Sequence, residues 1–85
     1  MSQETVDVAA LVRTIVEPLV EHKDELQVTQ SVNDYGDIYV EVSVHGDDTG
    51  KVIGRQGRVI KSIRTIARAA GSRAGAGQVD VELPD

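Results

Sequence analysis

The amino-acid sequence predicts an α+β domain in which one face of a three-stranded mixed sheet is covered by three helices. The first observation is size, because a chain of 85 residues is one domain, spanning residues 1–85. The second is the apolar pattern, which has a helical period in two segments and strict alternation in three others. The third is the order helix, strand, strand, helix, helix, strand. Since two helices precede the last strand, we expect it to pair in parallel through a right-handed crossover.

The first helix is predicted over residues 5–20, behind a flexible N-terminus at residues 1–4. Thr5 suits the N-cap and Asp7 the first turn, whereas Pro18 lacks a backbone N–H and should weaken the helix near its end. One apolar face consists of Val8, Leu11, Val12, Ile15 and Leu19. A second apolar side consists of Ala9, Val12, Val16 and Val20. One side should pack on the sheet, and for the other we favour a partner surface over additional core.

Two strands should follow and form an antiparallel hairpin. Residues 26–32 alternate between apolar and polar side chains, with Gln30 on the apolar face, which is typical of a half-buried strand. Residues 38–45 alternate more strongly. Residues 33–37 between them are rich in turn formers, and Gly36 can adopt a positive φ, so the sequence predicts a hairpin.

A short helix is predicted after the second strand. Residues 46–49 should end the strand and begin the helix, with Asp47 or Asp48 as its cap. Gly54 and Gly57 should break this helix, because glycine is a poor helix former.

A longer helix is predicted over residues 57–70, with an apolar stripe on one side and basic residues on the other. Residues 71–77 are small and glycine-rich, which indicates a loop. Residues 79–83 alternate again and form the last strand, which Pro84 ends.

The composition excludes several classes of function. The chain has no cysteine, which removes disulfides, thiolate catalysis and cysteine-based zinc sites. Tyr35 and Tyr39 are its only aromatic residues, so the core must consist of Val, Ile, Leu and Ala. No apolar run reaches the ~20 residues of a membrane span, and the first five residues do not resemble a signal peptide. We expect a cytoplasmic protein with no membrane span and no cofactor.

The charges are unevenly distributed along the chain. The net charge is −5, yet seven of the nine cations lie within residues 51–73, and no acidic residue falls between Asp48 and Asp80. The chain is therefore an acidic scaffold with one basic stretch. That stretch is either a solvated helix face or a surface for an anionic polymer.

The loop Gly54-Arg55-Gln56-Gly57 lies inside the basic stretch. Glycine has no Cβ, so a foreign backbone can approach closely, and the free N–H groups of the helix that follows suit a phosphate. Val52 and Ile53 precede the loop, where they would floor a groove for bases. The alternative is an ordinary tight turn between two helices. The predicted contacts are Lys51, Val52, Ile53, Gly54, Arg55, Gln56, Gly57, Arg58 and Lys61.

The pattern Val-Ile-Gly-x-x-Gly-x-Val-Ile at residues 52–60 resembles the signature of KH domains, whose GXXG loop clamps about four nucleotides. The αββααβ order resembles the type II KH fold, and residues 5–84 resemble the stand-alone bacterial KhpA family. The resemblance implies a single-stranded RNA-binding protein, an RNA chaperone or post-transcriptional regulator, that holds the RNA backbone at residues 54–57. Residues 71–78 would flank the groove. It also implies a homodimer, or a heterodimer with a larger KH-domain protein, KhpB.

An enzyme is the least favoured class. Residues 46–51 resemble a P-loop, but the glycines are too close together and Val52 stands where Ser or Thr would hold magnesium. His22 and His45 have no neighbours at metal-ligand spacing, so no metal site is expected. No nucleophile and base are suitably spaced, so no catalytic residue is predicted.

The serious alternative is a protein-interaction module of KH fold, for dimerisation or docking, in which RNA contact is secondary. The net negative charge favours it, and so does the scarcity of aromatic residues, because bases commonly stack on them. If the chain binds RNA, we expect weak binding with little sequence preference. Arg64, Arg68 and Arg73 either contact the RNA or are solvated.

Overall fold

The structure is a computed structural model that describes residues 6–84. The helices and strands within these residues are α1 (Val8–Val16), β1 (Gln27–Val32), β2 (Ile38–Ser43), α2 (Thr49–Ile53), α3 (Arg58–Arg73) and β3 (Val79–Glu82). Short 3₁₀ turns occur at Glu17–Leu19, Lys23–Glu25, Gly46–Asp48 and Arg55–Gly57. The predicted flexible residues 1–4 lie outside the described part of the chain.

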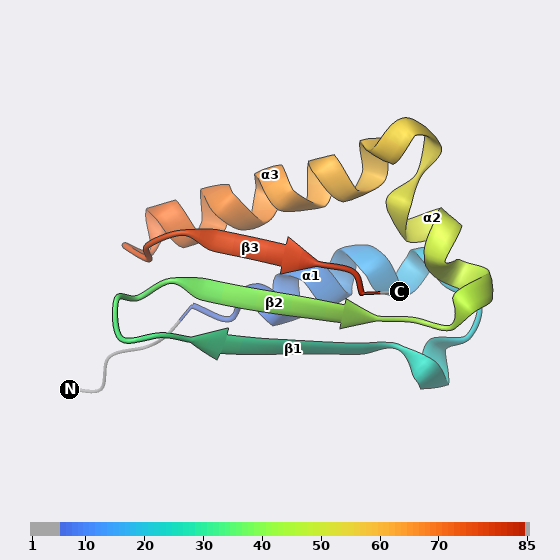
Figure 1. The fold of residues 1–85 in the computed structure, drawn as a ribbon, viewed down its shortest axis with the longest axis horizontal. Helices are drawn as coiled ribbons and strands as arrows, with labels where there is room; N and C mark the ends of the chain where they lie inside the picture. Colours follow the sequence, from blue (N-terminus) through green and yellow to red (C-terminus); the bar gives the residue numbers. More distant parts are fainter. Residues whose placement is uncertain (1–5, 85) are drawn as a thin grey trace.

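The sheet has the strand order β1-β2-β3, with β2 at its centre. Strands β1 and β2 pair antiparallel, with Val32 opposite Ile38, and β2 and β3 pair in parallel, with Ile38 opposite Val79. Helices α1 and α3 lie on the same side of the sheet and contact each other, while α2 contacts α3 at one end of the molecule (Figure 1). The predicted α+β fold, with a mixed sheet and three helices, is therefore confirmed.

The core between the sheet and the helices is aliphatic, as the composition predicted. The inward face of β2 contributes fully buried valines, and α1 and α3 supply the opposing side chains. The principal core residues are Val8, Val12, Val16, Ile38, Val40, Val42, Ile63, Ala67 and Val81. Both tyrosines are exposed, so they contribute little to the core.

Helix α1 is shorter than predicted. Its cap is Asp7, whose carboxylate accepts a hydrogen bond of 2.9 Å from Ala10 N–H, and the proposed cap Thr5 lies outside the described residues. The α-helix ends at Val16 and changes to a 3₁₀ turn that contains Pro18, as the missing N–H of proline requires. The prediction of a helix to residue 20 was wrong. Apolar residues continue at helical spacing to Val20, but the backbone changes from an α-helix to a 3₁₀ turn after Val16.

The second apolar side of α1 belongs to the core. Val12, Val16 and Val20 are buried, and the exposed large apolar residues of the described chain include none from α1. Leu11, Ile15 and Leu19 on the other apolar side are only partly buried, so a partner surface on this segment stays a prediction.

Helix α3 is longer than predicted, because it continues through Gly71 to Arg73. Gly71 is buried against β3, and a Cβ at this position would collide with Cγ2 of Val79. This glycine therefore serves close packing of the helix on the strand rather than breaking the helix. The loop that was expected over residues 71–77 is reduced to residues 74–78.

The start of α2 is fixed differently from the predicted carboxylate cap. The side chains of Asp47 and Asp48 do not cap α2; instead, Asp48 is buried and accepts hydrogen bonds from the N–H groups of Glu21 (3.1 Å) and His22 (3.0 Å). Asp48 thereby fastens the beginning of α2 to the segment that follows α1.

Candidate nucleic-acid interface

The GXXG loop joins α2 to α3 in a conformation that needs its glycines. Gly54 has φ 78° and ψ 172°, a region that is open essentially to glycine alone. Gln56 (φ 58°, ψ 25°) and Gly57 (φ 74°, ψ 16°) are both left-handed. Gln56 is the one non-glycine residue of the described chain with positive φ, a conformation that costs about 1–2 kcal/mol. The conformation of the loop therefore depends on its two glycines.

Gly54 also has no room for a side chain. A Cβ there would collide with the side chain of Val59 and would lie 2.8 Å from its backbone nitrogen. Gly57 differs, because the nearest atom to its Cβ would be 4.0 Å away, in Ile60. Close approach of α2 to α3 thus explains the first glycine, and backbone conformation explains the second.

Three cations surround the loop without internal neutralisation. Arg55, Arg58 and Lys61 are exposed, and within residues 6–84 no acidic side chain forms an ion pair with them. Arg58 Nη2 donates a hydrogen bond of 3.4 Å to Gln56 Oε1, which links the loop to the first turn of α3. These cations can therefore meet an anionic ligand.

Lys51, the fourth predicted cation, has internal partners. Its ammonium donates to Glu21 Oε1, and it lies 3.3 Å from Asp48 Oδ1. The hydrogen bond to Glu21 is the main reason that the pKa of Lys51 is raised, with Asp48 adding to the effect against the opposing effect of burial. A phosphate must compete with both carboxylates for Lys51.

Asp48 remains ionised although its side chain is buried. Burial raises the pKa of its carboxyl, but the N–H groups of His22 and Glu21 and the ammonium of Lys51 together outweigh burial and lower the pKa to about 2. The carboxylate therefore holds the start of α2 in place across the neutral pH range.

The two apolar residues before the loop have different environments. Val52 is fully buried in the core, so its side chain does not floor a groove, and this part of the prediction was wrong. Ile53 is 37% exposed and stands beside Gly54 on the surface. The alternation of exposure within α2 explains the difference, because adjacent residues of a helix face different directions.

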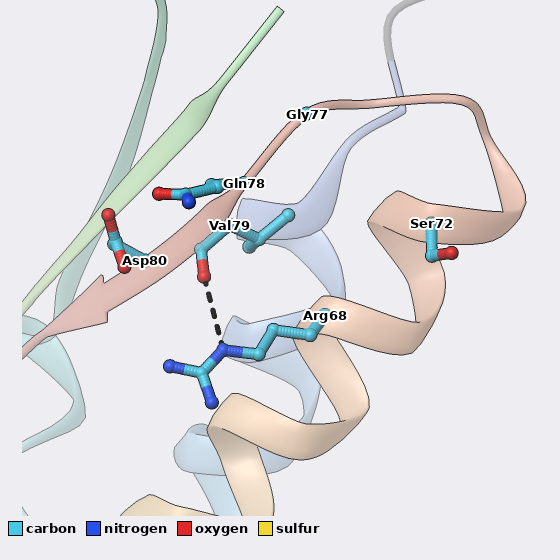
Figure 2. A pocket seen from close by; sticks show the side chains of 6 residues that line it. All are labelled: Arg68, Ser72, Gly77, Gln78, Val79 and Asp80. Atoms are coloured by element: carbon cyan, nitrogen blue, oxygen red, sulfur yellow. Dashed lines mark hydrogen bonds between the residues drawn. The ribbon is translucent and has the colours of Figure 1, made fainter.

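Two further arginines connect α3 to the outer edge of β3. Arg64 Nε donates to the carbonyl of Val81 (3.0 Å), and Arg68 Nε donates to the carbonyl of Val79 (3.4 Å). Figure 2 shows Arg68 reaching from the helix to this carbonyl. These hydrogen bonds hold the two side chains against β3. Whether Arg64, Arg68 and Arg73 contact RNA or only solvent stays a prediction.

An open pocket of about 450 Å³ lies beside Arg68, between the end of α3 and the start of β3. Figure 2 shows the side chains around it: Arg68, Ser72, Gly77, Gln78, Val79 and Asp80. The lining combines a cation, a carboxylate and an amide, so it offers both hydrogen-bond donors and acceptors. Sequence reasoning missed this pocket, since its two walls come together only through the packing of α3 on β3.

The structure thus gathers most of the predicted site at one end of the molecule. All predicted contacts except Val52 are exposed or partly exposed, and they lie on α2, on the loop and on the first turns of α3. They are Lys51, Ile53, Gly54, Arg55, Gln56, Gly57, Arg58 and Lys61. The additional participants are Glu21, which neutralises Lys51, and the anchored Arg64 and Arg68. Apart from their charge, nothing in the sequence around these three residues predicts the contacts that they make.

Comparisons with known proteins identify similar chains. A family model described as "KhpA/KhpB, KH domain" matches residues 9–83. The RNA-binding protein KhpA of Bacillus subtilis is 51% identical over 61 residues, which cover 72% of this chain and 74% of the relative. The KhpA of Halalkalibacterium halodurans is 43% identical over 63 residues, covering 74% and 82%. That of Clostridium acetobutylicum is 45% identical over 60 residues, covering 71% and 79%.

No solved structure gave a significant match to the chain. Within the described residues, no helix combines the length and the apolar character needed to cross a membrane.

Proposed function

The chain belongs to the KH-domain family of KhpA and KhpB, and on this basis we propose that it binds single-stranded RNA by holding the RNA backbone at Gly54–Gly57. The relatives are named RNA-binding proteins, which agrees with the prediction that the chain is not an enzyme. The observation that carries the proposal is the GXXG loop, which has a glycine-dependent conformation and three neighbouring cations that form no ion pair with an acidic side chain of residues 6–84.

The loop supports backbone contact in two ways. No atom lies closer than 4.0 Å to the position of a Cβ at Gly57, so an RNA backbone can approach the loop closely there. The side chains of Arg55, Arg58 and Lys61 add positive charge around the same point. Neutralisation of phosphates by such cations provides affinity that does not depend on base sequence.

The cations of α3 suggest the path that a bound RNA strand takes over the surface. Arg58, Lys61, Arg64 and Arg68 are spaced three or four residues apart, which places them along one flank of the helix, from the loop to the pocket beside β3. We place the RNA along this flank, with a base at the pocket. The pocket lining itself includes no aromatic side chain, so binding should be weak and largely sequence-tolerant. The exposed Tyr39 lies next to it on β2, opposite Asp80.

A direct test is fluorescence anisotropy with a labelled single-stranded oligouridylate at low salt. The wild-type protein should bind, and log K should fall against log salt concentration with a slope of about −2 for three phosphate contacts. The double variant Arg55→Asp, Gln56→Asp should abolish binding. Absence of binding by the wild-type protein, or unchanged binding by the variant, would refute the proposal.

A matched control is available on α1. The double variant Arg13→Asp, Thr14→Asp makes the same change in net charge at two adjacent exposed positions, on a helix that is not part of the GXXG loop. It should retain most of the affinity, because general repulsion is screened whereas the local contacts remain. Circular dichroism should show that both double variants are folded.

The cellular role follows the family. We propose a cytoplasmic RNA chaperone or post-transcriptional regulator that forms a homodimer, or a heterodimer with KhpB. The family description, which names KhpA and KhpB together, supports this pairing. Sedimentation velocity at high concentration, alone and with KhpB, should detect the association; a strict monomer under both conditions would exclude it.

The alternative function is a protein-interaction module in which RNA binding is secondary. The net charge of −5 favours it. Under this alternative, the Arg55→Asp, Gln56→Asp variant would associate normally with KhpB and would restore the function of a deletion strain, whereas an RNA-dependent function would be lost.

A further inference from the structure

Two histidines that are distant in the sequence meet on the surface at the junction between β2 and α2. The rings of His22 and His45 stack with centroids 3.8 Å apart and an interplanar angle of 16°. His22 precedes the 3₁₀ turn Lys23–Glu25, and His45 precedes the 3₁₀ turn Gly46–Asp48. The sequence spacing gave no indication of a metal site, because the two imidazoles are brought together only by the fold.

A carboxylate completes the cluster. Asp47 Oδ2 lies 3.7 Å from His22 Nε2 and 3.6 Å from His45 Nδ1. One donor atom from each of His22, His45 and Asp47 lies within 4.8 Å of the other two. We infer that these three residues form a binding site for a transition-metal ion such as Zn²⁺, separate from the GXXG loop.

The distances agree with this inference. Zinc binds imidazole nitrogen and carboxylate oxygen at about 2.0–2.2 Å, so neighbouring ligand atoms of a tetrahedral site are about 3.4 Å apart. The two measured nitrogen–oxygen separations exceed this value by only a few tenths of an ångström. Because the two rings are stacked nearly parallel, one imidazole would have to turn about its side-chain torsions so that both nitrogen lone pairs point at one ion. Asp47 would then be the third ligand, with water in the fourth position.

His45 already has a hydrogen-bond partner at one of its two nitrogens. Its Nδ1 accepts a hydrogen bond of 3.0 Å from the N–H of Asp47. The ion would take the place of this N–H. Glu25 Oε2 lies 3.9 Å from the other nitrogen, Nε2, where a carboxylate helps to orient the ring.

The donor set selects the type of ion. Two imidazoles and one carboxylate favour zinc, copper or nickel, whereas magnesium and calcium prefer oxygen ligands. The imidazoles are partly exposed, with side-chain exposures of 39% for His22 and 33% for His45, so an ion can reach them from solvent. Bound metal would tie the segment after α1 to the segment before α2, next to Asp48.

The inference can be tested on the full chain after treatment with a chelator. Titration with Zn²⁺ in a calorimeter should show one ion per chain. Because the chain has only two histidines, their proton NMR signals report the site directly, and both should shift in step with the heat. His22→Gln, His45→Gln and Asp47→Asn should each weaken binding at least tenfold, and Glu25→Gln about tenfold.

Asp24→Asn is the matched control, since it removes an exposed carboxylate in the same turn that makes no ion pair with the cluster. It should bind zinc as the wild-type protein does. His22→Gln keeps the test valid if His45→Gln disturbs the turn that His45 caps. The inference is overturned if the wild-type protein shows no saturable binding at millimolar Zn²⁺, or if His22→Gln binds zinc with unchanged affinity.

Discussion

The ammonium of Lys51 is paired with the carboxylate of Glu21, a residue 30 positions earlier in the chain. This pair lies beside the GXXG loop, so Glu21 withdraws one cation from the surface that we assign to RNA. Acidic residues therefore reduce the positive charge at one specific place on the surface, in addition to making the net charge of the chain negative.

The variant Glu21→Gln should bind single-stranded RNA more tightly than the wild-type protein, because Lys51 loses its principal competitor for phosphate. A gain of roughly twofold to fivefold at low salt corresponds to one exposed charge interaction. The salt dependence should also become steeper. Anisotropy titrations at several salt concentrations measure both effects. Asp24→Asn changes the net charge equally without freeing a cation, and an equal gain in that variant would contradict the assignment.

The two loop glycines should differ in their sensitivity to alanine. Gly54→Ala combines a forbidden backbone conformation with a collision against Val59, and it should lower the free energy of unfolding by about 2–4 kcal/mol. Gly57→Ala meets no close atom and should cost about 1 kcal/mol through its left-handed φ alone. Urea denaturation at neutral pH gives both values. The reverse order would show that the close packing at Gly54 is misassigned.

Stability should fall in acid because of Asp48. The folded-state pKa of this carboxyl is about 2, below its ordinary value of 3.8, so the unfolded chain binds the proton more readily. Its contribution to stability is complete above about pH 4 and is lost as the pH falls toward 2. Asp48→Asn should be less stable than the wild-type protein at pH 7 and should lose less stability across this window. Thermal unfolding at a series of pH values makes the comparison, with Asp24→Asn as the control.

Gly71→Ala should destabilise the protein by about 1–2 kcal/mol although alanine is the better helix former, because the new methyl group collides with Val79. In a Val79→Ala background, the same change should become neutral or stabilising.

Gly50→Ala provides the contrast in α2. No atom lies within 4 Å of a Cβ at position 50, so this change should stabilise the protein by up to about 1 kcal/mol. Denaturation of the four variants tests the packing of α3 on β3.

The features that sequence patterns predicted correctly are those that depend on neighbouring residues. Alternation along residues 38–43 identified β2, because a central strand with one buried face requires it. Asn33 and Gly36 marked the hairpin turn, and Gly36 has the expected positive φ of 81°. The GXXG loop was located for the same reason, since its backbone conformation depends on its own glycines.

The features that the patterns missed depend on residues from elsewhere in the chain. Gly71 was taken for a loop residue because composition cannot show that Val79 packs against it. Val52 was assigned to the RNA surface although it faces the core. Lys51 was counted as a free cation because its partner Glu21 is remote in the sequence. In each case, a tertiary contact overrides a local signal.

The arginines of α3 have a consequence for aggregation. Strand β3 is an edge strand, and such edges are templates for uncontrolled strand addition and fibril growth. Arg64 and Arg68 occupy the carbonyls of Val81 and Val79 that an incoming strand would require, and they bring two positive charges to the same edge. The side chains that align with the proposed RNA path should thus also hinder a strand of a neighbouring molecule from adding to this edge of the sheet.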